Sequence, residues 1–204
     1  MPRLPRPLPR SFYVRPTVQV ARELLGLILI HRSPAGMAAG RIVEVEAYLG
    51  QDDPASHAFR GPRGRAAVMY REGGLSYVYF SYGVHYCMNV VTDQEGVGGA
   101  VLIRALEPTS GIELMQKRRG LSDPKSLASG PGKLAQALAI GPEQNAHELW
   151  RGELTLVPGS APRTIAVSTR IGITRAADRE LRFYDPDSPH VSRKRVASHH
   201  SCVL

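Results

Sequence analysis

Hydrophobic and charged residues alternate through residues 41–48, which read Arg-Ile-Val-Glu-Val-Glu-Ala-Tyr. Such alternation is typical of a β-strand, because successive side chains leave opposite faces. Two carboxylates beside a tyrosine make a poor apolar face, so this face is either an exposed edge of a sheet or the wall of a polar site. The period of two predicts that Ile42, Glu44, Glu46 and Tyr48 share that face and that Val43, Val45 and Ala47 share the other.

A second patterned stretch predicts two strands, residues 75–80 and 84–91, joined near Ser81-Tyr82-Gly83. Gly83 can adopt the positive φ that a tight hairpin turn needs. The turn would hold Tyr82 at the tip of a rigid projection, where the ring either packs against the protein or is covered by a partner. The hairpin is rich in tyrosine, and together with the carboxylate strand it indicates a pocket for a flat, polar, aromatic ligand.

The remaining pattern predicts short helices and further strands. Thr17 is expected to cap a helix that ends at Gly26, and Ser110 with Glu113 matches a capping box for a helix that runs to Arg119 and stops at Gly120. On the strand 99–106, Leu102, Arg104 and Leu106 are expected to share a face. Further helices are expected at 134–140 and 143–149, and further strands at 27–31, 163–168 and 181–184.

Residues 49–74 are punctuated by glycine and proline, hold His57 and several arginines, and predict a long functional loop. The fold class that follows is α+β: a single compact domain over 12–191 with a curved, mainly antiparallel sheet, surrounding helices and a protruding hairpin. Residues 1–11, rich in proline and arginine, are expected to form a mobile arm, and residues 192–204 a disordered basic tail.

Composition narrows the class of partner. The 204 residues carry a formal net charge of +8, and the arginines are clustered, which favours nucleic acid over a membrane as the partner. The two cysteines give neither a disulfide framework nor a zinc site, and the N-terminus lacks the apolar core of a signal peptide. We therefore expect a cytoplasmic monomer, associated with the nucleoid if bacterial.

Four long motifs follow one another in order and resemble the 3-methyladenine DNA glycosylase family of the alkyladenine type. They are Arg-Ile-Val-Glu-Val-Glu-Ala-Tyr, Tyr-Val-Tyr-x-x-Tyr-Gly-x-x-Tyr-Cys-Met-Asn, Val-Leu-Ile-Arg-Ala-Leu-Glu-Pro and Ser-Gly-Pro-Gly-Lys-Leu, and the resemblance runs from Phe12 to Val191. It implies an enzyme of base excision repair that binds double-stranded DNA, flips a damaged purine out of the duplex and hydrolyses its N-glycosidic bond. It implies no cofactor and no metal.

The resemblance also implies roles for individual residues. Glu46 would be the catalytic base, and Arg104 would help to hold the attacking water and keep Glu46 ionised. The flipped base would lie among Tyr48, His57 and Tyr79, with Asn89 crowding the exocyclic amino group of normal guanine and Leu102 beside it. On the DNA side, Tyr82 is the expected wedge, with Met69 nearby, and the phosphate contacts are expected to be Arg65, Arg71, Ser129 and Lys133.

The chain departs from the family in the loop before the hairpin. Family members often have Thr-x-Arg-Asn there, whereas this chain has Arg63-Gly64-Arg65-Ala66 and keeps only the arginine. The departure bears on how the loop is anchored and grips DNA, and it leaves the chemistry unchanged.

Two other functions remain as alternatives. A metal-dependent nuclease could use Glu44, Glu46, Asp52 and Asp53 as oxygen ligands. A non-enzymatic RNA-binding protein could stack bases on the tyrosine-rich hairpin. The first three motifs contain no lysine, which argues against Schiff-base chemistry and strand cleavage.

Overall fold

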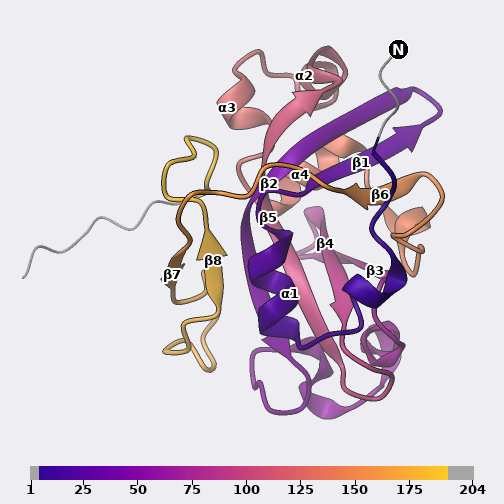
Figure 1. Ribbon diagram of the computed structural model, residues 1–204, viewed down its shortest axis with the longest axis vertical. Helices are drawn as coiled ribbons and strands as arrows, with labels where there is room; N and C mark the ends of the chain where they lie inside the picture. Colours follow the sequence, from indigo (N-terminus) through magenta and orange to yellow (C-terminus); the bar gives the residue numbers. More distant parts are fainter. Residues whose placement is uncertain (1–4, 193–204) are drawn as a thin grey trace, which may run out of the picture.

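The longest strand, β2 (Gly36–Leu49), organises the sheet in the computed structural model, which describes residues 5–192. Its first half pairs with β1 and its second half with β8, while β5 pairs along its other edge; every pairing in the sheet is antiparallel. The strand order is β3-β4-β5-β2-β1-β6, and β7 joins through β8 (Figure 1). The other strands are β1 (Ile28–Ser33), β3 (Ser76–Ser81), β4 (His85–Thr92), β5 (Gly99–Ser110), β6 (Leu154–Val157), β7 (Ala166–Ser168) and β8 (Arg182–Tyr184).

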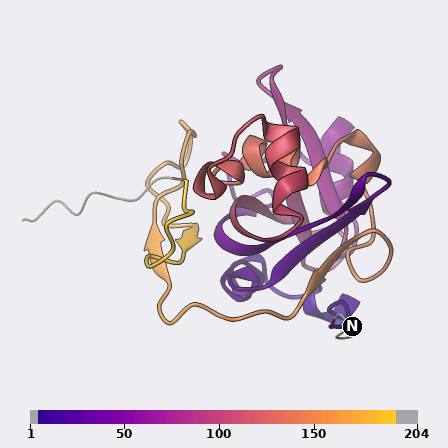
Figure 2. The same cartoon turned by 90° about the horizontal axis from the view of Figure 1, so that it is seen from above.

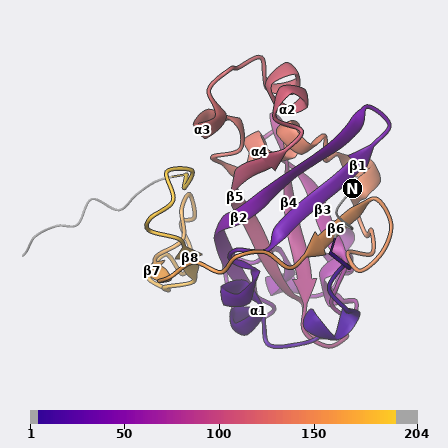
Figure 3. The same ribbon diagram turned by 45° about the horizontal axis from the view of Figure 1, so that its top comes forward.

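Short helices surround this curled sheet, which confirms the predicted α+β class. Helices α2, α3 and α4 gather at one end of the sheet, and α1 lies across β2 and β5 (Figure 3). The bounds are α1 (Thr17–Leu24), α2 (Ile112–Arg119), α3 (Pro124–Leu127) and α4 (Pro131–Leu138), with 3₁₀ helices η1 (Arg10–Phe12), η2 (His57–Arg60), η3 (Gly64–Tyr70) and η4 (Pro142–Gln144).

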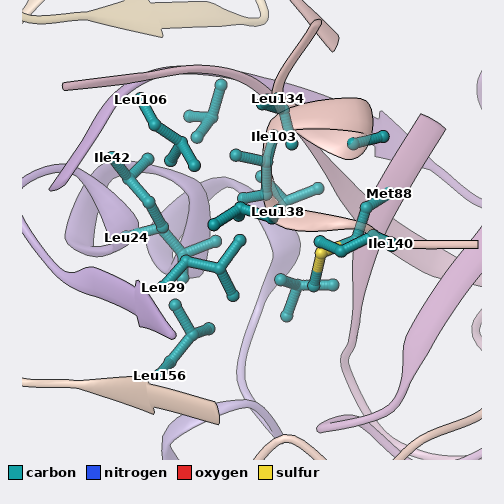
Figure 4. Close-up of a cluster of buried hydrophobic side chains, with 14 of the residues drawn as sticks. Leu24, Leu29, Ile42, Met88, Ile103, Leu106, Leu134, Leu138, Ile140 and Leu156 are labelled. Carbon is teal, nitrogen blue, oxygen red and sulfur yellow. The ribbon is translucent and has the colours of Figure 1, made fainter. Parts of the chain in front are cut away.

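The main core lies between one face of the sheet and the helices α1 and α4. Leu24 from α1 and Leu138 from α4 meet Leu29, Ile42 and Ile103 from the strands, all of them fully buried (Figure 4). Removal of this apolar surface from water contributes most of the free energy that stabilises the fold. Two smaller apolar clusters lie apart from this core, one around Tyr77 and Val91 and one around Val43 and Tyr184.

The alternation expected along β2 breaks near its middle. The pairing of β2 with β5 shifts register on either side of Glu44, which is typical of a β-bulge. Ile42 consequently packs in the main core with Val45, and Val43 packs in a separate cluster with Tyr184. The prediction that Ile42 shares the face of the two glutamates is therefore wrong, because a bulge moves every residue beyond it by one position.

The same register shift alters β5. Leu106 lies in the main core with Ile103, whereas Leu102 and Arg104 line a cavity on the opposite side of the sheet. Leu102 and Arg104 do share a face, as predicted, but Leu106 does not.

The hairpin of β3 and β4 forms as predicted and projects from the body of the molecule (Figure 2). Ser81 pairs with His85, and the turn between them has positive φ at Tyr82 (51°) and Gly83 (67°). These dihedrals belong to the primed turns whose twist matches a hairpin.

Both predicted N-terminal caps are wrong. Thr17 is the first residue of α1, and the carboxylate of Asp93 accepts from its backbone N–H at 3.0 Å and from its hydroxyl at 2.6 Å. Ser110 ends β5, and Gly111, with φ 69°, is the residue that precedes α2. At α1 a carboxylate from another segment takes the role assigned to Thr17, and at α2 the residue before the helix makes no side-chain cap hydrogen bond. The expected stop at Gly120 is confirmed.

Several smaller elements differ from expectation. The loop 49–74 contains η2 and η3, β6 and α3 were not expected, and η4 is shorter than the helix expected over 143–149. β6 is only four residues long, so the sequence offers too few positions to show a period.

Part of the expected arm contacts the domain. Leu8 donates its N–H to the carbonyl of Leu156, and the Arg10 guanidinium lies 4.8 Å from the centre of the Trp150 ring. Residues 1–4 and 193–204, the rest of the expected arm and tail, lie outside the described residues. Within residues 5–192 no helix is long and apolar enough to cross a membrane.

Candidate active site

A cavity of about 710 Å³ opens beside the hairpin, on the face of the sheet opposite the main core. Strands β2, β3, β4 and β5 supply its floor, η2 and η3 one wall, and the segment after β7 another. The predicted residues that line it are Tyr48, His57, Arg65, Met69, Tyr79, Tyr82, Asn89, Leu102 and Arg104. Residues distant in sequence are thus brought to one concave site.

Glu46 lies beneath this cavity and is completely buried, so the alternative of an exposed sheet edge is wrong. Its Oε2 accepts a hydrogen bond from the hydroxyl of Tyr48 at 2.9 Å and lies 3.3 Å from Nη1 of Arg104. Its Oε1 accepts from the backbone N–H of Ile171 at 2.7 Å. Both oxygens therefore face donors, an arrangement that suits the ionised carboxylate.

Burial nevertheless dominates the electrostatics of this carboxyl. Desolvation raises the pKa of Glu46 above its ordinary value, while the charge of Arg104 and the donors Ile171 and Tyr48 lower it and Glu44 raises it. Arg104 thus acts in the expected direction without cancelling the effect of burial. A carboxylate with a raised pKa is a stronger base than an exposed glutamate, as a proton acceptor near neutral pH requires.

The neighbouring Glu44 is also completely buried. Its Oε1 accepts from Nε of Arg104 at 3.0 Å and from Nε of Arg182 at 2.8 Å. Ser192 donates its N–H to Oε2 at 2.6 Å and its hydroxyl to Oε1 at 2.8 Å. Glu44 therefore orients Arg104 and anchors Ser192, which was expected in the tail.

Aromatic rings line the mouth of the cavity. Tyr77 and Tyr79 are stacked with their ring centres 5.3 Å apart, and His57 meets the face of Tyr79 edge-on at 4.6 Å. Nδ1 of His57 lies 2.8 Å from the hydroxyl of Tyr77, and its Nε2 lies 3.3 Å from Nη2 of Arg65. A guanidinium can only donate, so Nε2 is the acceptor and Nδ1 carries the proton.

Desolvation, followed by the positive charge of Arg65, lowers the pKa of His57 to about 4. His57 is therefore neutral near pH 7 and contributes a polar ring rather than a charge. Because the ring carries no charge of its own, it does not repel a cationic base.

Asn89 and Leu102 are paired across β4 and β5 on the cavity floor. The amide nitrogen of Asn89 donates to the carbonyl of Tyr77 at 3.0 Å, so the side chain is held in one orientation. A fixed amide and a branched apolar side chain together restrict which base edges fit.

The two expected wedge residues differ in position. Tyr82, at the hairpin tip, has 86% of its surface exposed, whereas Met69 is 2% exposed and packs in η3 beside Val68 and Tyr70. Met69 therefore forms a wall of the cavity and does not project, because η3 folds that part of the loop against the sheet.

The other expected phosphate contacts, Arg71, Ser129 and Lys133, are not among the residues that line the cavity. Arg71 is exposed just after η3, and Lys133 is exposed at the start of α4, with Nζ 3.3 Å from the hydroxyl of Ser129. Pro131, in the same helical turn, does line the cavity. The free N–H groups at the start of α4 therefore lie near its rim.

Sequence patterns missed residues that hold the site together. Tyr77 stacks on Tyr79, Ile171 binds Glu46 through its backbone, and Arg170 forms a buried ion pair with Asp53. Tyr77 could have been found from its period-two spacing to Tyr79. The other contacts join segments more than one hundred residues apart and leave no local signal.

The geometry weighs against the nuclease alternative. The carboxylate oxygens of Glu44 are engaged by arginines and Ser192, and those of Asp53 by Arg170 and backbone N–H groups. Within residues 5–192 no group of three or more histidine, cysteine or acidic side chains is arranged to hold a metal ion.

Comparison with known proteins shows the family of this chain. Residues 11–189 match the family model described as methylpurine-DNA glycosylase (MPG). A protein of Methanoculleus marisnigri is 54% identical over 192 residues, which cover 92% of this chain and 99% of the relative. One from Chlorobaculum tepidum is 47% identical, with 90% and 89% covered, and one from Rhodopseudomonas palustris is 48% identical, with 91% and 88% covered. All three carry the provisional name 3-methyladenine DNA glycosylase. The chain therefore belongs to the methylpurine-DNA glycosylase family and is a DNA glycosylase of the 3-methyladenine type.

Proposed function

We propose that this glycosylase flips a damaged purine into the cavity and hydrolyses its N-glycosidic bond, with Glu46 as the general base. The observation that carries the proposal is the buried Glu46 beneath a cavity lined by aromatic rings, with Arg104 3.3 Å away. Cleavage builds positive charge at C1′ of the sugar. An anionic carboxylate stabilises that charge and accepts a proton from the attacking water, which Arg104 helps to hold.

Selection of the damaged base rests in part on the tyrosine rings. Methylation at N3 or N7 gives a purine a positive charge, and the face of Tyr48 or Tyr79 attracts such a base by about 1–2 kcal/mol beyond ordinary stacking. Undamaged adenine gains less. The neutral His57 adds a third ring without a charge of its own, so the aromatic rings favour cationic purines without excluding flat neutral ones.

Asn89 and Leu102 set the limits of that breadth. The 2-amino group of guanine would meet the fixed amide of Asn89, whereas hypoxanthine carries no such group and ethenoadenine extends from another edge. We therefore place hypoxanthine and ethenoadenine with 3-methyladenine among the substrates.

Flipping requires a side chain to fill the space that the nucleotide leaves, because extrusion costs a few kcal/mol of stacking and pairing. Tyr82 is suited to this role by its 86% exposure at the tip of a rigid turn. Arg65, which lines the cavity, together with Arg71, Ser129 and Lys133 would hold the flanking phosphates.

Excision would be hydrolytic and leave the strand intact. Among the described residues that line the cavity, none is a lysine, so a Schiff base with the sugar has no nucleophile there. The expected product is free base and an abasic site.

The test is release of free base from duplexes that each carry one defined lesion, with a metal chelator present. We expect the wild-type protein to release base without strand breaks, and Glu46→Gln to bind the same duplexes while its single-turnover rate falls about 10²- to 10⁴-fold. Near-normal turnover by Glu46→Gln would contradict the assignment of the base. Direct strand breaks that the chelator abolishes would favour the nuclease.

A further inference from the structure

Arg170 and Asp53 form an ion pair in which both side chains are completely buried. Nη2 of Arg170 donates to Oδ1 of Asp53 at 2.8 Å, and Nη1 contacts Oδ2. Asp53 also accepts the backbone N–H groups of Leu49 at 3.1 Å and Ala55 at 3.2 Å. Burying two charges is costly and commonly gives little net stability, so a pair of this kind is often explained by the geometry that it fixes.

The pair reaches Glu46 by two routes. The guanidinium of Arg170 lies over the ring of Tyr48, 4.6 Å from its centre, and Tyr48 donates its hydroxyl to Oε2 of Glu46 at 2.9 Å. The next residue along the chain, Ile171, donates its N–H to Oε1 at 2.7 Å. Each oxygen of Glu46 is therefore bonded by a group that touches or adjoins Arg170.

Arg170 is also the anchor of an irregular segment. No helix or strand lies between β7 and β8, that is, through residues 169–181, yet Ile171, Gly172 and Ile173 of this segment line the cavity. Nη1 of Arg170 donates to the carbonyl of Ala47 at 3.0 Å, which ties the segment to β2. Without this anchor, the Ile171 amide has no regular structure to hold it against Glu46.

We infer that the Arg170–Asp53 pair is a positioning unit for catalysis, which holds the Tyr48 hydroxyl and the Ile171 amide against the two oxygens of Glu46. This inference rests on the role proposed for Glu46. Neither Arg170 nor Asp53 lines the cavity, and the pair reaches the site through Tyr48 and through the segment that holds Ile171.

The consequence is a change in how Glu46 titrates. Charged and titratable groups face this carboxyl from each neighbouring element: Glu44 and Tyr48 from β2, Arg104 from β5, Arg182 from β8, which is paired with it in register, and Arg170 from the segment after β7. Loss of the pair loosens two donors that favour the ionised form and leaves burial and Glu44 unchanged. In a plot of excision rate against pH, the fall in rate on the acid side (the acid limb) should then move to higher pH.

The experiment removes both charges at once, because a single substitution would leave the other charge buried and unpaired. The test variant is Asp53→Leu with Arg170→Met. The control is Arg41→Met with Asp185→Leu, which removes a partly buried pair, 3.0 Å between Nη1 and Oδ2, and leaves the other partner of Arg41, Glu107, as a half-exposed carboxylate. Single-turnover excision of a hypoxanthine duplex is measured from pH 5 to 9, beside the melting temperature.

We expect the test variant to lose about 10- to 100-fold in rate at neutral pH, as a displaced catalytic group does, with its acid limb at higher pH. The control should keep the wild-type rate and limb. A test variant that matches the control in both respects, or loses rate with an unmoved limb, overturns the inference.

Should the double variant not fold, Arg170→Lys gives the same readout. A lysine retains the charge but cannot both make two hydrogen bonds to Asp53 and stack on the ring of Tyr48. If the acid limb of the Arg170→Lys profile lies at the same pH as in the wild type, the inference is overturned. Glu46→Gln distinguishes the two proposals. Near-normal activity in Glu46→Gln contradicts the role proposed for Glu46, whereas an inactive Glu46→Gln together with an unmoved acid limb in the pair variant contradicts only the role of the pair.

Discussion

The backbone N–H of Ile171 donates a 2.7 Å hydrogen bond to Oε1 of Glu46, across 125 residues of sequence. The Tyr48 hydroxyl and Arg104 face the other oxygen at 2.9 and 3.3 Å. A carboxyl buried this deeply would otherwise favour its neutral form, so these three groups decide how much of it is ionised at a given pH. Catalysis by Glu46 should therefore be sensitive to changes that do not touch Glu46 itself.

Tyr48→Phe tests that sensitivity, because it removes one donor and keeps the ring. The ionised form of Glu46 is the active base, so the rate is lost as pH falls through its pKa, which burial has already raised. Removing the Tyr48 donor raises that pKa further, and the acid limb should move to higher pH while the rate on the alkaline side changes less. Single-turnover excision against pH measures the shift.

Tyr79→Phe is the matched control for this experiment. Its ring also lines the cavity, but its hydroxyl makes no contact with Glu46 within the described structure. The acid limb should stay where it is in the wild type, whatever the rate. If the acid limb lies at the same pH in the wild type and in Tyr48→Phe, the Tyr48 hydroxyl does not control the ionisation of Glu46.

The two glutamates of β2 should respond differently to the same substitution. Glu44→Gln leaves Arg104 and Arg182 buried without their shared carboxylate, and such a loss costs about 3 kcal/mol or more. Urea unfolding should show this loss in Glu44→Gln and a smaller one in Glu46→Gln, because one arginine, at 3.3 Å, faces Glu46 whereas two bond Glu44. Equal unfolding midpoints for the two variants would mean that Glu44 does not anchor the arginines.

Local patterns were sufficient to predict part of this site. Alternation identified β2 and the Tyr82 hairpin, and Gly83 indicated its turn, because strands and turns depend on neighbouring residues. The period of two placed Glu46 and Tyr48 on one face, and their 2.9 Å hydrogen bond agrees with it. The resemblance to a known family supplied Arg104 as their partner.

Long-range features could not be predicted in this way. The bulge next to Glu44 depends on the register between β2 and β5, and it moved Ile42 and Leu106 into the main core. The pairing of Asp53 with Arg170 spans 117 residues, and each residue alone resembles an ordinary loop charge. Only the folded chain shows that the two charges neutralise each other.

Phosphate contacts around the cavity should make DNA binding depend on salt. Arg65→Ala should reduce the slope of log affinity against log salt by about 0.9, the value for one phosphate on B-DNA. The control is Arg151→Ala, since Arg151 is exposed but already paired with Glu148. Fluorescence anisotropy with an undamaged duplex at several salt concentrations gives both slopes. An unchanged slope for Arg65→Ala would confine Arg65 to its contacts with His57 and Tyr79.

The exposed ring of Tyr82 allows its role in flipping to be separated from any role in stability. With 86% of its surface in solvent, Tyr82 contributes little to the core, so Tyr82→Ala should keep the wild-type melting temperature. Tyr82→Phe, which retains the ring, is the matched control and should behave as the wild type. A lowered melting temperature with equal loss on every substrate would mean that the ring packs against the protein.

Excision by Tyr82→Ala should depend on how firmly the lesion is held in the duplex. Without the ring, the vacated stack stays empty and the damaged base returns to it more readily, so less of it occupies the cavity. The loss should be largest for a lesion paired with its preferred partner and smallest for a mispaired or single-stranded one, because those bases cost less to extrude. A fluorescent base analogue placed opposite different partners reports the flipped fraction directly, and the order of its values should match the order of the excision rates.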